Sequence, residues 1–149
     1  MRRPRGGGGS VGGMTTGMKE LKLWQEAVAL GVDAARLARG VARPETRVLV
    51  DRLLLAAAEV AVRIAAGYTH DRPATQREYY LAARAALVEV ETLLTIGRQA
   101  ALVPADAALA AGARAGGVHR LLAGYLAFVD RQVDGAGLAS DSGGRSPPA

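Results

Sequence analysis

The chain has 149 residues, enough for one domain with a hydrophobic core and too few for two ordinary domains. Half of the residues are hydrophobic, but the aromatic ones are only one Trp, four Tyr and one Phe, so Ala, Leu and Val have to build the core. The absence of cysteine excludes a disulfide framework, thiolate metal sites and a cysteine nucleophile. The net charge is +5, but residues 18–134 carry 15 basic against 13 acidic side chains, so composition alone does not require a nucleic-acid-binding surface.

Three prolines divide the middle of the chain into four apolar-periodic segments: Pro44, Pro73 and Pro104. Proline is accepted in the first turn of a helix and resisted in its interior, so these residues mark three connections. We therefore predict an all-α fold, an antiparallel up-down four-helix bundle over residues 18–134. The Gly/Arg-rich leader, residues 1–17, and the Gly/Ser/Pro-rich tail, residues 135–149, are predicted to be disordered.

The first two predicted helices have clear limits in the sequence. The first runs from about Lys19 to Arg39, and Gly40 can end it. Its apolar residues alternate steps of four and three: Leu23, Ala27, Leu30, Ala34, Leu37 and Val41. The second helix starts near Pro44 and has a natural stop at Gly67.

The sequence predicts the last two helices with signals of different strength. The third opens with Thr75-Gln76-Arg77-Glu78, which has the pattern of a capping box. The fourth begins near Pro104 and is the weakest, because each interior glycine costs about 1 kcal/mol relative to Ala. A close helix approach at these glycines and a break after Gly117 are both compatible with the pattern.

The sequence does not predict a membrane segment. The longest apolar stretch, residues 48–66, is interrupted by four charged side chains and is therefore an amphipathic helix. Basic residues near the N-terminus are not followed by the apolar region of a secretory signal. We expect a cytoplasmic protein without a membrane partner.

The sequence also lacks any recognisable arrangement of catalytic or metal-binding residues. The two histidines, His70 and His119, are far apart and have no second ligand at metal-binding spacing, while Glu89 and Glu91 diverge on a helix. The glycines of residues 6–13 precede no strand and no phosphate-binding GK[ST] sequence. We therefore expect no enzymatic activity, no catalytic residues, no metal and no cofactor.

Two groups of basic residues remain as candidate nucleic-acid-binding sites, since arginine binds phosphate through bidentate hydrogen bonds and counterion release. The first group surrounds the first connection: Arg36, Arg39, Arg43 and Arg47. The second group is expected at the opposite end of the bundle: Lys19, Lys22, Arg72 and Arg77. The alternative is a solvated charged rim, because helix C-termini favour basic residues in any case.

Three blocks of the sequence resemble one protein family. Residues 18–27, MKELKLWQEA, are similar to the D/E-L-x-V/I-W-Q-x-A opening of the four-helix-bundle proteins encoded in ribosomal RNA intervening sequences. Residues 64–68, IAAGY, resemble their N-I-A-E-G-[FY] motif, and residues 78–94 resemble their E-[FY]-x-x-[FL]-x-x-A-x-[GR]-S-x-x-E-x-E-[TS] block. The chain departs from these motifs at Arg63, where Asn is usual, at Ala66, where Glu is usual, and at Val88, where a small residue is common.

The resemblance implies a function that involves no enzymatic activity. The family is related to the accessory variability determinant of diversity-generating retroelements, a basic four-helix bundle that forms a homopentamer and binds nucleic acid and a reverse transcriptase. By this resemblance we expect a non-enzymatic accessory protein with RNA or DNA, and a reverse transcriptase, as partners, and with a homo-oligomeric state, a pentamer favoured. The alternative is an oligomeric interaction or structural module with no nucleic-acid role.

Overall fold

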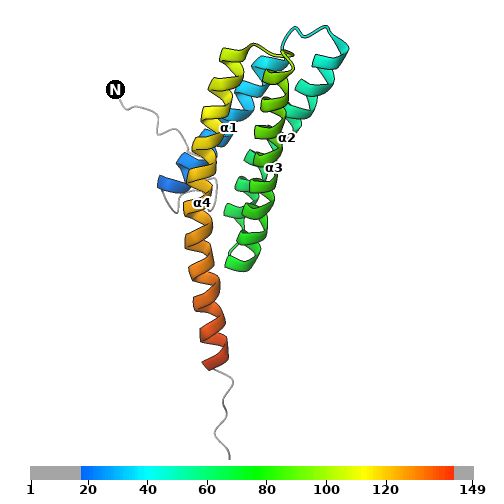
Figure 1. Ribbon diagram of the computed structural model, residues 1–149. Helices are drawn as coiled ribbons and strands as arrows, with labels where there is room; N and C mark the ends of the chain where they lie inside the picture. Colours follow the sequence, from blue (N-terminus) through cyan, green and yellow to red (C-terminus); the bar gives the residue numbers. More distant parts are fainter. Residues whose placement is uncertain (1–17, 143–149) are drawn as a thin grey trace, which may run out of the picture.

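The computed structural model describes residues 18–142, which fold into four helices: α1 (Met18–Ala38), α2 (Pro44–Thr69), α3 (Pro73–Gln99) and α4 (Ala105–Ser142). Successive helices run in opposite directions (Figure 1). Each helix packs on the next, and α4 closes back on α1, so the described helices form a ring in which α1–α4 lies across from α2–α3. The predicted all-α four-helix fold is confirmed. Within the described range, no helix is long and apolar enough to cross a membrane.

The core is aliphatic and follows the predicted stripes. On α1 the residues at alternating steps of four and three are the buried ones: Leu23, Ala27, Leu30 and Ala34. The other helices bury their apolar faces against it, and the small alanines at these positions allow the helices to pack closely. Apolar periodicity therefore determines which side of each helix faces inward.

Three tyrosines form an aromatic cluster at the end of the core where α2 joins α3. The rings of Tyr68 and Tyr80 meet edge to face at 6.1 Å, and Tyr80 meets Tyr125 of α4 at 5.4 Å. Gly67 is buried beneath this cluster and lies inside α2, which continues to Thr69. The expectation that Gly67 ends the helix is therefore wrong. A Cβ atom at this position would lie 2.5 Å from Cε1 of Tyr80, so the glycine is needed for close packing.

The connections are short and use the residues expected to end or start helices. Gly40 follows α1 with a φ of +73°, in the left-handed region that glycine adopts without strain. Pro44 and Pro73 occupy the first turns of α2 and α3. The predicted capping box is wrong, because α3 already starts at Pro73 and Thr75 lies inside its first turn.

The fourth helix is continuous and longer than expected. It has no break after Gly117, because Ala115 and Val118 on either side are both fully buried and packing outweighs the low helix propensity of glycine. The bundle was expected to end at Asp134, whereas α4 continues to Ser142, and its last part extends past the turn between α2 and α3 (Figure 1). Alanine and leucine in residues 135–139 favour helix and offset the two glycines there. The leader, residues 1–17, and residues 143–149 lie outside the described part of the chain.

Candidate functional site

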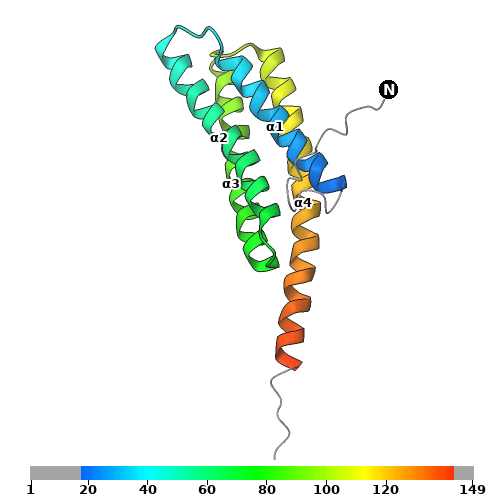
Figure 2. The same cartoon turned by 180° about the vertical axis from the view of Figure 1, so that it is seen from behind.

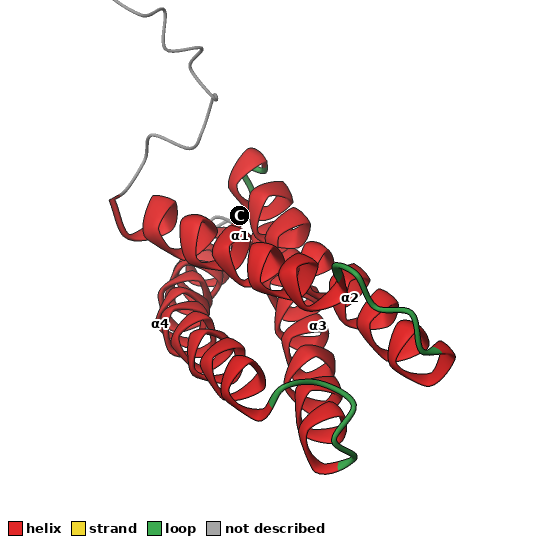
Figure 3. Cartoon of the chain, turned by 90° about the horizontal axis from the view of Figure 1, so that it is seen from above, coloured by secondary structure: helices red, strands yellow, loops and turns green. Residues whose placement is uncertain are grey.

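The first predicted group of arginines lies at one end of the bundle. Arg36 is in the last turn of α1, Arg39 lies in the connection, and Arg43 is the residue that precedes α2. All three side chains are exposed. The connection between α3 and α4 lies at this same end, which we call the loop end (Figures 1 and 3). It brings the exposed Arg98, in the last turn of α3, to the loop end as well.

The loop-end arginines differ in whether they are paired. Nε of Arg47 lies 3.2 Å from Oδ2 of Asp51, one turn further along α2, in an exposed ion pair. Within residues 18–142, Arg36, Arg39 and Arg43 form no ion pair. These three guanidinium groups are therefore available to an anion, and Arg47 is the member of the predicted group whose charge is already balanced.

The structure does not bring the second predicted group together. Arg72 is exposed at the turn between α2 and α3, and Nε of Arg77 lies 2.5 Å from Oδ1 of Asp130 on α4. Lys22 lies elsewhere, beside Arg120 of α4 in a shared groove. The reason is length: α1 is shorter than its neighbours and starts well short of the α2–α3 turn (Figure 2). Lys19 lies in the first turn of α1, and its side chain is outside the described residues.

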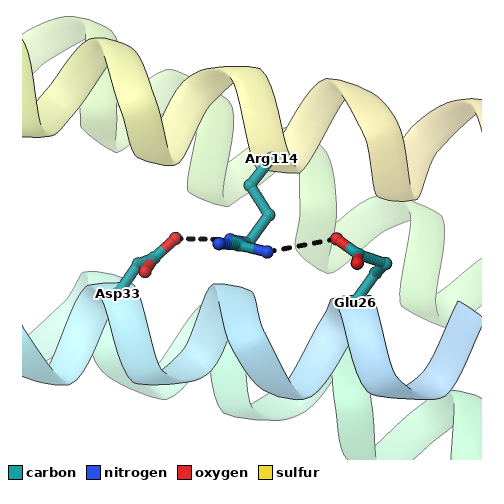
Figure 4. Close-up of polar contacts among 3 residues, drawn as sticks. All are labelled: Glu26, Asp33 and Arg114. Atoms are coloured by element: carbon teal, nitrogen blue, oxygen red, sulfur yellow. Dashed lines mark hydrogen bonds and ion pairs between the residues drawn. The ribbon is translucent and has the colours of Figure 1, made fainter. Parts of the chain in front are cut away.

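A clamp of three charged residues joins α1 to α4 near the middle of their contact (Figure 4). Nε of Arg114 donates to Oδ2 of Asp33 at 2.7 Å, and Nη1 donates to Oε2 of Glu26 at 3.2 Å. The hydrogen bond and the charge of Asp33 raise the pKa of Arg114 above its usual value. The clamp therefore pairs two acidic residues of α1, Glu26 and Asp33, with one guanidinium group of α4.

Two grooves lie along the α1–α4 contact. The loop-end groove is lined by Arg36 and Arg39 and has an apolar floor made of Leu37, Val41, Pro104 and three alanines of α4. The mid-bundle groove is lined by Lys22, Glu26, Gly117, Arg120 and Leu121. Asp33 lines the first groove and Glu26 the second, so the Arg114 clamp lies between them.

Polar side-chain contacts also join α2 to α3 and α3 to α4. Arg52 of α2 pairs with Glu89 of α3 at 2.7 Å. Nδ1 of His119 on α4 lies 2.8 Å from Oε1 of Glu91 on α3. In the described part of the chain, no group of His, Cys, Asp and Glu side chains could hold a metal ion. At the loop end and along α1–α4, in contrast, Arg36, Arg39, Arg43, Lys22 and Arg120 form no ion pair within residues 18–142.

Sequence reasoning missed three basic residues of this surface. Arg98 has a simple signal, since it is the basic residue in the last turn before the third connection. Arg114 and Arg120 lie in a glycine-rich segment, where the predicted fourth helix was weakest. Their neighbours on α1 depend on how far α4 is shifted along α1, which the spacing within one helix does not reveal.

The comparison with protein families shows which family the chain belongs to. A family model described as 23S rRNA-intervening sequence protein matches residues 19–124. The chain belongs to this family. The match covers α1, α2, α3 and the first half of α4, and thus all the residues of the two grooves. A comparison with curated proteins found no match.

Proposed function

We propose that this intervening sequence protein is a non-enzymatic accessory protein that binds RNA or DNA through the arginines of the loop end. The observation that carries the proposal is that Arg36, Arg39 and Arg43 are exposed, close in sequence and without ion pairs within residues 18–142. Unpaired guanidinium groups bind phosphate strongly and release counterions when they do so. The basic leader, with Arg2, Arg3 and Arg5, adds to the same electrostatic attraction.

The test replaces Arg36, Arg39 and Arg43 together with Gln. Because the leader would mask the effect, both the parent and the variant carry Gln at positions 2, 3 and 5. We expect weaker binding to RNA and DNA of any sequence. The negative slope of log affinity against log salt should become less steep by about 2 for a single strand, since each phosphate contact contributes about −0.7. Fluorescence anisotropy over a salt series measures both quantities.

The matched control removes three charges elsewhere. Arg52, Arg63 and Arg77 are paired with Glu89, Glu59 and Asp130, so changing them to Gln alters the net charge equally away from the loop end. Exposed ion pairs contribute little to stability, so this variant should also fold. Equal losses in the two variants would mean that overall charge, and not a site, attracts the nucleic acid. A parent protein without salt-dependent binding would refute the proposal.

The protein partner in this proposal is a reverse transcriptase of a diversity-generating retroelement. It is supported by the resemblance of residues 18–27, 64–68 and 78–94 to the family related to the accessory variability determinant. A neighbouring gene for a reverse transcriptase, with paired template and variable repeats, would support this partner. A gene lying inside a ribosomal RNA insertion would contradict it.

The second candidate function is an oligomeric interaction module with no nucleic-acid role. The observation that favours it is an apolar stripe on α2, where Val48, Leu55 and Val62 recur every seven residues and are 71%, 72% and 59% exposed. Such a stripe is typical of a helix that packs against a partner. Both candidates include a homo-oligomer, and salt-dependent binding by the parent protein distinguishes them.

A further inference from the structure

The α1–α4 face has a charge distribution of its own. Its two grooves each carry two basic side chains that form no ion pair within residues 18–142: Arg36 and Arg39 in the loop-end groove, Lys22 and Arg120 in the mid-bundle groove. The clamp between them contains one guanidinium group and two carboxylates. Anions are therefore attracted to two separate places on this face and not to the clamp.

Arg120 places its guanidinium group where an anion in the mid-bundle groove can reach it. Its side chain folds back along α4, since a Cβ atom added at Gly116 would lie 3.6 Å from Nη1 and one at Gly117 would lie 3.8 Å from Nη2. The glycines leave open backbone next to the guanidinium group, so a ligand can approach closely. Lys22 reaches the same groove from α1.

The distance between the grooves suits a short strand. Lys22 and Arg36 are 14 positions apart on α1, which corresponds to about 21 Å along the helix at 1.5 Å per residue. One nucleic-acid strand advances about 3.4 Å per nucleotide when stacked, so about six nucleotides connect the two grooves, and fewer if the strand is extended.

The floors of the grooves favour unpaired bases. The loop-end groove offers Leu37, Val41 and Pro104 beside its arginines, and the mid-bundle groove offers Leu121 beside Lys22 and Arg120. Bases in a single strand can turn into such apolar surfaces while the phosphates stay on the basic groups, whereas a duplex keeps its bases stacked inside.

We propose that a single-stranded nucleic-acid segment lies along α1–α4, with phosphates bound in the loop-end and mid-bundle grooves and the strand crossing the Arg114 clamp between them. This inference rests on the proposed function and adds the strand type and its path. The path lies across the helix ring from the α2–α3 contact, so it leaves the apolar stripe of α2 free for self-association.

The experiment measures how affinity depends on oligonucleotide length. Full-length protein with Gln at positions 2, 3 and 5 is titrated with fluorescent oligouridylates of 4, 6, 8 and 12 nucleotides and with a 12-base-pair RNA duplex. We expect a step in affinity of at least tenfold between 4 and 8 nucleotides, because the second groove then binds a strand that is already held. The duplex should bind more weakly than the 12-nucleotide strand.

The decisive variant changes Lys22 and Arg120 together to Gln. This variant should abolish the step in affinity, because a strand bound in the loop-end groove no longer has a second basic groove to bind. The affinity for the 4-nucleotide strand, which the loop-end groove binds, should change by no more than about twofold. The control changes Arg52 and Arg63 to Gln, which removes the same charge from the other side of the bundle and should preserve the step. Both variants alter exposed or half-exposed side chains, and their melting curves verify the fold.

The outcomes separate the path from the function. If the step survives the change at Lys22 and Arg120 while the loop-end arginines still matter, the path is wrong and the proposed function stands. Equal binding of duplex and single strand would also overturn the path. A complete absence of salt-dependent binding would instead refute the proposed function on which the path rests.

Discussion

Gly67 shows how one residue can set the distance between two helices. It is buried in α2 against the ring of Tyr80, which is itself buried and in edge-to-face contact with Tyr68 and Tyr125. A side chain at position 67 would have to displace this ring, which other rings hold in place. The sequence could predict a glycine with a special role here. Whether that role is to end the helix or to allow a close contact depends on a residue of another helix.

Replacing Gly67 with Ala should destabilise the protein, although alanine is the better helix former. The favourable helix propensity is about 1 kcal/mol, whereas overpacking a buried site costs about 1–3 kcal/mol, so we expect a net loss of up to about 2 kcal/mol. The control is Gly124→Ala on α4, where a Cβ atom meets no other atom within 4 Å, and which should be neutral or stabilising. Urea denaturation compares the two, and equal stabilisation would show that the Tyr80 ring moves freely.

At the scale of helices, α1 and α4 have the least extensive contact in the ring, and the Arg114 clamp strengthens it. The inward faces of all four helices follow from apolar spacing, because burial selects those residues whatever the neighbour is. The clamp and the grooves beside it could not be predicted in that way. Arg114 is 81 residues from Asp33 and 88 from Glu26, and their meeting depends on the register between the first and last helices.

Changing Arg114 to Met should lower the free energy of unfolding by about 1–3 kcal/mol, the range for leaving a largely buried polar group without its hydrogen-bond partner. The loss has a clear cause, since Asp33 is only 22% exposed and would be left without its donor. The control is Arg52→Met, which breaks an exposed ion pair between α2 and α3 and should cost less than about 1 kcal/mol. Chemical denaturation measures both. Similar losses would mean that the clamp is an ordinary surface ion pair.

At the scale of the whole molecule, two surfaces differ in chemistry: the basic grooves along α1–α4 and the exposed apolar stripe on α2. Five basic residues at the loop end and along α1–α4 form no ion pair within residues 18–142, namely Arg36, Arg39, Arg43, Lys22 and Arg120. The exposed apolar stripe of α2 lies on the side of that helix opposite its buried residues. The loop-end arginines could be predicted because they surround one short connection. That Lys22 and Arg120 line the same groove could not be predicted, since this requires knowing that α1 is too short to reach the α2–α3 turn.

We propose that the α2 stripe, Val48, Leu55 and Val62, is the surface through which copies of the chain associate, with a pentamer favoured by the family resemblance. Sedimentation or light scattering at micromolar concentration should report an oligomer. Changing Leu55 and Val62 together to Glu should produce a monomer, because the charges would repel across the contact and lose water on burial. The monomer should remain folded, as both side chains are exposed on the isolated bundle.

The matched control is Leu109→Glu, which places a charge at another exposed leucine, 57% exposed on α4, and should leave the oligomer intact. Loss of the oligomer should also weaken nucleic-acid binding, although every arginine is unchanged. In an assembly, a strand bound at one loop end meets the neighbouring loop ends at a high effective concentration. A monomeric parent protein would end the assembly hypothesis. An oligomer that survives both glutamates would instead mean that copies associate through another surface. The α1–α4 face would then have to be tested as that surface, because a face covered by a second copy could not bind the proposed nucleic-acid strand.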